Sequence, residues 1–106
     1  MKTIVGFLAR PHGYNALSAL VESQNYKIIK LYTHKLNPKS QDLQRSIRAD
    51  YELFVKKCAE NSIPLISIDS KDHEITDFPE CDYIIEVSWR YIIPQNIINK
   101  ARRDAF

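Results

Sequence analysis

The fold of this chain is decided by the stretch IVGFLARPHG, residues 4–13. Residues 4–8 form an uninterrupted apolar run, which is typical of a strand buried on both faces of a parallel sheet. Residues 10–13 end that run, and a loop is expected at residues 9–13. After Gly13, apolar side chains recur at three- and four-residue spacing as far as Val21, and this spacing marks one face of a helix. The sequence therefore begins with a buried strand followed by a helix.

The same alternation continues along the chain. Three further strands are predicted, at residues 27–33, 63–68 and 82–88, where short apolar runs are bounded by polar turn formers. Two further helices are predicted, at residues 43–61 and at residues 94–103, the second with a proline as its first residue. Residues 34–40 and 69–80 are predicted to be polar loops.

Alternating strands and helices specify an α/β fold, a parallel sheet with helices on both faces. Because crossover connections are right-handed, few topologies are possible, and the Rossmann-like order 3-2-1-4 is the commonest for four strands. In that order the first and fourth strands are neighbours, and the loops that follow them open a crevice at their carboxyl ends. We therefore expect a ligand site there. Its expected lining is Arg10, His12 and Gly13 from one loop and Ser88, Trp89 and Arg90 from the other.

Length and composition limit the class of protein. The 106 residues fit one domain, and contents of 44% hydrophobic and 26% charged residues are typical of a globular chain. No apolar run approaches the ~20 residues that cross a bilayer, and no signal peptide is indicated. The formal charge of +2 is too small to predict nucleic-acid binding. We expect a cytoplasmic protein without a membrane or nucleic-acid partner.

Cysteine and histidine spacing gives no sign of a metal site. Cys58 and Cys81 have neither the spacing of zinc ligands nor that of a disulfide framework, and we expect both to be structural thiols. His34 and His73 lie in polar loops without a partner at ligand spacing. Both are expected to be solvated.

The two loops of the expected site suit different chemical groups. Arg10 and His12 precede a helix N-terminus, whose free N–H groups favour phosphate or carboxylate; the alternative is a polar turn that only connects two elements. The chain has two glycines and no G-x-G-x-x-G fingerprint, so tight binding of an NAD-type dinucleotide is not predicted. Residues 89–91, Trp-Arg-Tyr, would expose planar groups that stack on planar ligands. Alternatively, Trp89 belongs to the core and Arg90 is a surface charge.

Several segments match a known family in order and spacing. They are Gly13-Tyr14 with Leu17 and Ala19-Leu20, Tyr32 to Pro38, Ala59 to Pro64, Asp82 to Pro94, and Ala105-Phe106. Together they resemble the N-terminal half of the folate-dependent formyltransferases, over nearly the whole chain. The segment from Thr33 to Pro38 is similar to enzymes that act on 4-amino-4-deoxyarabinose nucleotides, more than to those that act on glycinamide ribotide or on methionyl-tRNA.

This resemblance implies transfer of a formyl group from 10-formyltetrahydrofolate to a primary amine of a nucleotide sugar. It implies a cofactor-binding segment that consists of Ser88, Trp89, Arg90, Tyr91 and Ile92, with the pterin against the backbone of residues 90–92. The substrate-binding positions that it implies are Arg10, His12, Gly13, Tyr14, Thr33, His34 and Asn37. The family's catalytic Asn, His and Asp have no counterpart among residues 1–106. The chain is therefore expected to be an incomplete N-terminal domain, inactive alone and without a catalytic residue.

In the full family fold, another strand would pair beside residues 82–88. We therefore expect that strand to have an unpaired edge, through which two copies of the chain could form a homodimer. Two other functions compete with a formyltransferase domain. One is a non-catalytic ligand-binding module or pseudoenzyme that acts through a partner chain. The other is a receiver-like signalling domain, which is disfavoured because residues 10–12, Arg-Pro-His, stand where such a domain needs an acidic pair.

Overall fold

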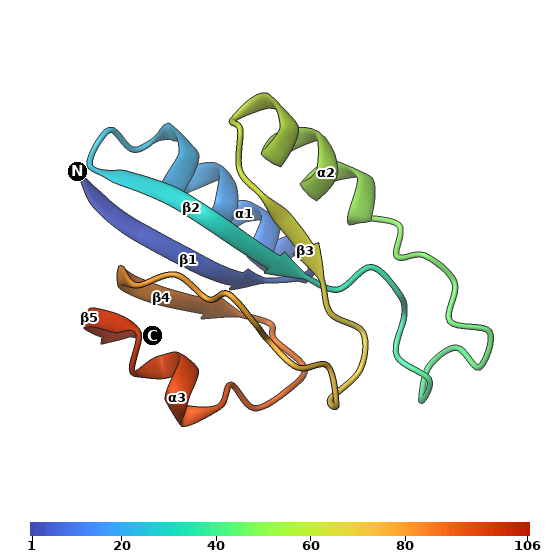
Figure 1. Cartoon of the computed structure of the whole chain (residues 1–106). Helices are drawn as coiled ribbons and strands as arrows, with labels where there is room; N and C mark the ends of the chain where they lie inside the picture. Colours follow the sequence, from blue (N-terminus) through green and yellow to red (C-terminus); the bar gives the residue numbers. More distant parts are fainter.

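Strand β1 (Lys2–Leu8) is the centre of a five-stranded, all-parallel sheet in the computed structural model, which describes residues 1–106 (Figure 1). The other strands are β2 (Tyr26–Thr33), β3 (Leu65–Ser67), β4 (Cys81–Val87) and β5 (Ala101–Ala105). The helices are α1 (Arg10–Glu22), α2 (Tyr51–Glu60) and α3 (Gln95–Ile98). The strand order is β3-β2-β1-β4-β5. This confirms the α/β class and the order 3-2-1-4 for the four predicted strands, and adds a fifth strand.

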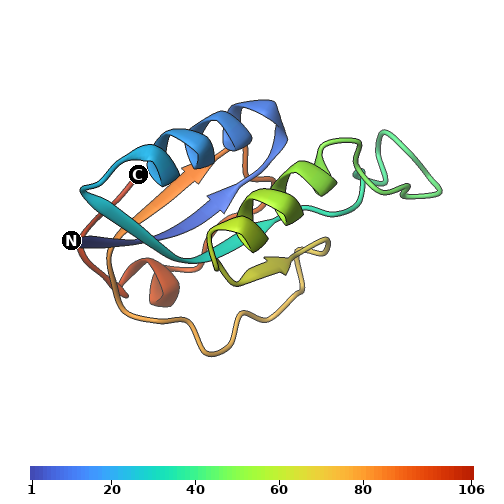
Figure 2. The same ribbon diagram turned by 90° about the horizontal axis from the view of Figure 1, so that it is seen from above.

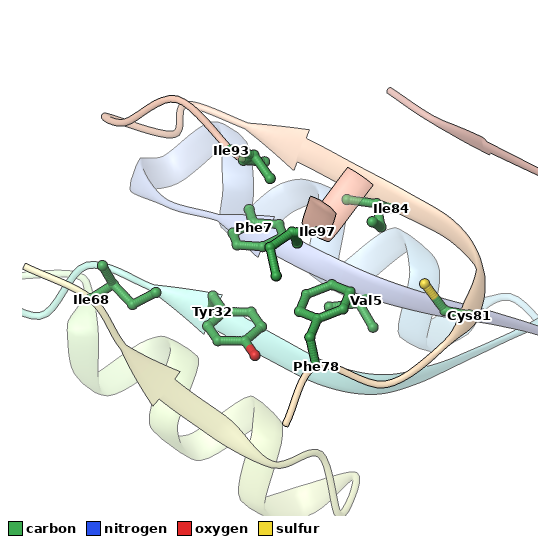
Figure 3. Packing of buried hydrophobic residues seen from close by; sticks show 9 residues of the cluster. All are labelled: Val5, Phe7, Tyr32, Ile68, Phe78, Cys81, Ile84, Ile93 and Ile97. Carbon is green, nitrogen blue, oxygen red and sulfur yellow. The ribbon is translucent and has the colours of Figure 1, made fainter. Parts of the chain in front are cut away.

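Two apolar clusters lie on opposite faces of the sheet. Helices α1 and α2 cover one face of the sheet and α3 covers the other (Figure 2). Ile4 and Leu8 belong to the cluster on the side of α1 and α2, whereas Val5 and Phe7 belong to the cluster on the side of α3, because successive side chains of a strand alternate between faces. The crossover from β3 to β4 has no helix. Instead, Phe78 covers the sheet there and stacks on Phe7, with ring centroids 6.0 Å apart (Figure 3).

Helix α1 begins at Arg10, directly after β1, so the loop expected at residues 9–13 is wrong. Pro11 lies in the first turn of α1, where its fixed φ suits a helix and its missing N–H is not needed. Gly13 is buried against the end of β1, and a Cβ atom at this position would lie 2.9 Å from the carbonyl carbon of Leu8. The glycine therefore allows the helix to pack closely on the strand that precedes it.

Helix α2 begins at Tyr51, so the helix expected from residue 43 is wrong in its first part. The carboxylate of Asp42 accepts hydrogen bonds from the backbone N–H groups of Gln44 and Ser46, at 3.0 and 2.9 Å. Such side-chain bonds compete with helical hydrogen bonding. Leu43 is 86% exposed, so its apolar side chain does not belong to a buried helical face. Residues 34–50 form one long loop.

The helix expected at residues 94–103 is also wrong, because α3 ends at Ile98 and the chain then forms β5. Beyond β5, Phe106 donates its N–H to Ile84 and accepts the N–H of Glu86, both at 2.8 Å. Without these partners, the backbone N–H and C=O groups along the edge of β4 would be unpaired. Their need for hydrogen bonds outweighs the helical pattern of residues 99–103. The edge expected at residues 82–88 is therefore occupied, and a second copy could use it only by displacing β5.

The two cysteines are buried and free, as expected of structural thiols. Burial raises the pKa of Cys58 to about 11, so this thiol is not a reactive thiolate at neutral pH. None of the helices has the length and apolar character needed to cross a membrane.

Candidate functional site

The carboxyl ends of β1 and β4 lie side by side. Leu8 pairs with Val87, and the N–H of Ala9 donates to the carbonyl oxygen of Val87 at 3.1 Å. A cavity of about 380 Å³ lies beside these ends. We call it the cationic groove; it is lined by Arg10, His34, Pro38, Ser40, Gln41, Arg48, Ser88, Trp89 and Arg90. The structure thus brings Arg10 and Trp89 to one cavity, as the strand order predicts.

The chain turns sharply where it leaves both strands. Arg10 has a φ of 64° and Ser88 a φ of 59°, and both residues therefore occupy the left-handed region that non-glycine residues rarely adopt. Each such residue costs on the order of 1 kcal/mol or more and persists only where surrounding contacts hold it. These turns direct the backbone away from the sheet on both sides of the groove.

Three arginines give the groove its positive charge. Arg10 is exposed and forms no ion pair. Arg48 is paired with Asp50, with 3.1 Å between Nε and Oδ1. The third, Arg90, is largely buried, and it forms a long ion pair, with 3.9 Å between its Nη1 and Oδ1 of Asp69. Three arginines therefore face only two partner carboxylates, those of Asp50 and Asp69. Because of this excess of positive charge, the groove suits an anionic ligand.

Arg90 is hydrogen-bonded at one end of its guanidinium, and the other end forms only the 3.9 Å ion pair with Asp69. Its Nη2 donates to the carbonyl oxygen of Leu36 at 2.5 Å, whereas Nη1 is buried without a hydrogen-bond partner. Burial lowers the pKa of Arg90 below its ordinary value, but an arginine stays charged at neutral pH. The side chain therefore has donor capacity that the chain itself does not use.

His34 lies beneath the groove and is only 2% exposed, so the expectation that it is solvated is wrong. Its Nδ1 is 2.5 Å from the carbonyl oxygen of Ile68, and its Nε2 is 3.2 Å from the backbone nitrogen of Arg90. Since a carbonyl only accepts and an amide only donates, the proton lies on Nδ1. Burial is the main cause that lowers the pKa of His34 to about 4, and the imidazole is therefore neutral at pH 7. The loops that follow β2, β3 and β4 close over the ring.

Asp69 holds the long loop in place, although it is not among the site residues predicted from the sequence. Its Oδ1 accepts the N–H groups of Lys35 and Leu36, at 3.0 and 2.8 Å. Its carbonyl oxygen accepts a hydrogen bond from Nη2 of Arg45 at 2.7 Å. The signal that could have indicated it was an acidic residue directly after a predicted strand. Arg48 was missed because it was assigned to the solvated face of a helix expected at residues 43–61, and Ser40 and Gln41 were missed because they were expected in or beside a polar connecting loop.

A second cavity, of about 210 Å³, lies on the other side of Trp89. We call it the apolar cavity, since seven of its 13 lining residues are hydrophobic, namely Ile68, Ile75, Trp89, Tyr91, Ile92, Ile93 and Ile97. Trp89 is the residue that lines both cavities. It is packed edge-on against Phe7, with ring centroids 5.1 Å apart, and face-on against His34 at 4.0 Å. Trp89 is thus partly a core residue and partly a wall of each cavity.

Five residues selected from the sequence line neither cavity: His12, Gly13, Tyr14, Thr33 and Asn37. His12 is exposed on α1, and Gly13 lies under that helix. The ring of Tyr14 packs against α2, while Thr33 is buried. The carbonyl oxygen of Asn37 accepts a hydrogen bond within the long loop. The structure brings the other selected residues to the cavities: Arg10, His34, Ser88, Trp89 and Arg90 to the groove, and Tyr91 and Ile92, with Trp89, to the apolar cavity.

No protein-family model matches this chain, and no curated protein matches it.

Proposed function

We propose that this chain binds the two substrates of a formyl transfer in the cytoplasm. One is a nucleotide sugar that carries a primary amine, and the other is 10-formyltetrahydrofolate. The observation that carries the proposal is that Trp89 separates a cationic groove from an apolar cavity. A reaction between two ligands of different character needs adjacent sites of this kind.

The cationic groove supports binding of a phosphorylated ligand. Guanidinium groups donate planar, paired hydrogen bonds that match phosphate oxygens. Arg10 has no carboxylate partner, and Nη1 of Arg90 has no hydrogen-bond partner. Arg10 can therefore bind phosphate without first breaking an ion pair within the chain, whereas Arg90 adds positive charge and an unused donor beside the 3.9 Å ion pair with Asp69.

The apolar cavity supports binding of a planar ring. Its volume of about 210 Å³ suits a ring system rather than a whole cofactor, because pockets for complete ligands usually exceed ~300 Å³. Tyr91 and Ile92 line it, and Ile92 is 94% exposed, so a bound pterin would cover apolar surface that now faces solvent. Bound folate would supply the formyl group, and these residues would orient its ring.

The proposal assigns binding and no catalytic role to these residues. His34 lines the cationic groove and contacts Trp89 and Arg90, but both of its ring nitrogens are hydrogen-bonded and it is buried. It is therefore not a free base. The same observation favours a second candidate function, a non-catalytic module that binds one ligand and acts through a partner chain.

Isothermal titration tests the proposal. We expect 5-formyltetrahydrofolate and a 4-amino-4-deoxyarabinose nucleotide each to bind, and to bind together. The variant Arg10→Gln should lose at least about tenfold in nucleotide affinity, since hydrogen bonds to charged groups contribute about 1.5 to 3 kcal/mol, and should keep its folate affinity. The variant Ile92→Ser should show the reverse. The matched control Arg103→Gln, at the distant β5, should change neither.

Binding of only one ligand would favour the second candidate, the non-catalytic module. Absence of heat with both ligands, or equal losses in Arg10→Gln and Arg103→Gln, would contradict the formyl-transfer proposal.

A further inference from the structure

One buried side chain connects the carboxyl ends of three strands. His34 follows directly after Thr33, the last residue of β2. Its Nδ1 donates to the carbonyl oxygen of Ile68, directly after β3, and its Nε2 accepts the N–H of Arg90, three residues beyond β4. A histidine is suited to this bridge because its two ring nitrogens point in different directions and can donate on one side while accepting on the other.

The contacts of His34 concentrate on residues 88–91, the segment between the two cavities. The imidazole stacks on Trp89, with ring centroids 4.0 Å apart and an angle of 19° between the planes. The ring of Tyr91 meets the imidazole edge-on at 5.4 Å and 87°. Together with the hydrogen bond to Arg90, these contacts fix three consecutive residues.

We infer that His34 is a positioning residue, which holds residues 88–91 in the conformation that borders both cavities. The segment needs such support because Ser88 has a positive φ, which persists only where neighbouring contacts impose it. The claim about conformation stands on the geometry alone. The claim that this conformation matters for ligand binding rests on the proposed function.

The bridge requires a neutral imidazole. Protonation would place a hydrogen on Nε2, opposite the N–H of Arg90, so that two donors would face each other. The charged groups around the ring are Arg90, Arg48 and Asp69; the two arginines oppose protonation and Asp69 favours it, while burial opposes it most strongly. The bridge is therefore intact at neutral pH and is released in acid.

Two substitutions test the two hydrogen bonds of His34 one at a time. In His34→Asn the amide nitrogen can replace Nδ1 and still donate to Ile68, but nothing accepts from Arg90. In His34→Gln the longer side chain brings its amide oxygen to the place of Nε2, where it can accept the Arg90 N–H. A merely structural role would make both variants similarly unstable, whereas a positioning role through Arg90 distinguishes them.

The first measurement is amide hydrogen exchange by NMR on the unliganded full chain at pH 7. In His34→Asn we expect the Arg90 amide to exchange about tenfold faster, which corresponds to loss of one hydrogen bond. The amides of Val5 and Ile84, in the centre of the sheet, should not change. In His34→Gln, protection of Arg90 should be largely restored. Equal protection of Arg90 in wild type and His34→Asn, or uniform acceleration of all three amides, would overturn the inference.

Trp89 provides a second measurement, which needs no variant to fold. It is the one tryptophan of the chain, and an imidazolium in contact with an indole quenches its fluorescence. In the wild type we expect the emission to fall with a midpoint near pH 4, the pKa of His34, before far-UV circular dichroism reports loss of the helices. Emission that changes only together with unfolding would overturn the inference.

Titration with 5-formyltetrahydrofolate and with uridine 5′-diphosphate then separates this inference from the proposed function. We expect His34→Asn to weaken both probes about tenfold and His34→Gln to recover most of the affinity. If the wild type binds neither probe but Arg90 is loosened in His34→Asn, the positioning role stands and the proposed function fails. If the wild type binds both probes and His34→Asn binds them equally well, with Arg90 still protected, the positioning role fails and the proposed function stands.

Discussion

The imidazole of His34 is held in a neutral form by its burial beneath the loops that follow β2, β3 and β4. In an unfolded chain the same group has an ordinary pKa of 6.5, whereas burial lowers the pKa of folded His34 to about 4. A group with different pKa values in the two states makes folding stability depend on pH. This residue therefore gives the chain a pH response that begins above the range in which carboxylates titrate and extends down to about pH 4.

We predict that the free energy of unfolding falls as the pH is lowered from 6.5 to about 4. In this window the unfolded chain binds a proton that folded His34 does not accept, so acid favours the unfolded state. The contribution is fully present above pH 6.5, and its loss by pH 4 amounts to about 3 kcal/mol. Urea denaturation at stepped pH measures it. The slope should become much shallower in His34→Gln and persist in His73→Gln, because the lowered pKa values of Asp42 and Asp82 add only a small slope near pH 4; equal slopes in both variants would contradict the prediction.

Gly13 permits the close contact between α1 and β1, and its replacement provides a second test. In Gly13→Ala the added Cβ would lie 2.9 Å from the backbone carbon of Leu8, and backbone cannot move aside as a flexible side chain can. We expect a net destabilisation of about 1 kcal/mol, since overpacking costs about 1 to 3 kcal/mol and the better helix propensity of alanine returns about 1 kcal/mol. Chemical denaturation measures it. Asn15→Ala, on an exposed position of α1, is the control, and a stabilised Gly13→Ala would refute the tight contact.

At the scale of elements, the loop of residues 34–50 supplies much of the groove, although it contains no regular helix or strand. Its conformation comes from polar contacts with the segments around it. Asp69 binds two backbone N–H groups at the start of the loop, and Arg45 returns from within the loop to the backbone of Asp69. The groove therefore depends on the attachment of this loop to the end of β3.

We predict that Asp69→Ala destabilises the fold by about 1 to 3 kcal/mol, because two backbone N–H groups lose their acceptor. It should also increase the rate at which trypsin cleaves after Lys39, which is exposed in the loop. The matched control is Asp72→Ala, an exposed carboxylate whose loss should change neither property. If the two variants behave alike, Asp69 does not hold the loop.

For the whole molecule, the sheet joins two cores into one unit. The radius of gyration is 13.4 Å, close to the ~13 Å typical of a single domain of about 100 residues. Alternate residues of β1 contribute to each cluster, Ile4 and Leu8 to one and Val5 and Phe7 to the other. Because β1 belongs to both clusters, we expect the two clusters to unfold together.

We therefore predict coincident unfolding transitions by two probes of opposite faces. Trp89 fluorescence reports on the cluster beside α3, and far-UV circular dichroism reports mainly on α1 and α2, which pack on the other face. The two denaturation midpoints should agree within error, as in a two-state transition. A fluorescence midpoint at clearly lower denaturant would show that the face of α3 unfolds independently.

The buried apolar run of β1, the helical period of α1 and the alternation of later segments were sufficient to predict the parallel sheet and the neighbouring positions of β1 and β4. These features are local patterns that report burial and period directly. From that topology, the meeting of Arg10 with Trp89 also followed. The formyl-transfer proposal comes from motifs in the same sequence and awaits the binding experiments.

Only the tertiary structure decided which secondary structure is formed by residues whose local pattern is ambiguous. Residues 101–105 follow a helical pattern but form β5, because the backbone of β4 needs hydrogen-bond partners. Residues 43–50 were expected to be helical but form a loop, in which Asp42 accepts the N–H groups of Gln44 and Ser46 and the side chain of Arg45 donates to the carbonyl oxygen of the distant Asp69. The burial of His34 likewise depends on residues 34 and 56 positions away along the chain, Ile68 and Arg90. Contacts between residues so far apart in the chain leave no periodic signal in the sequence, whereas a strand or helix face does.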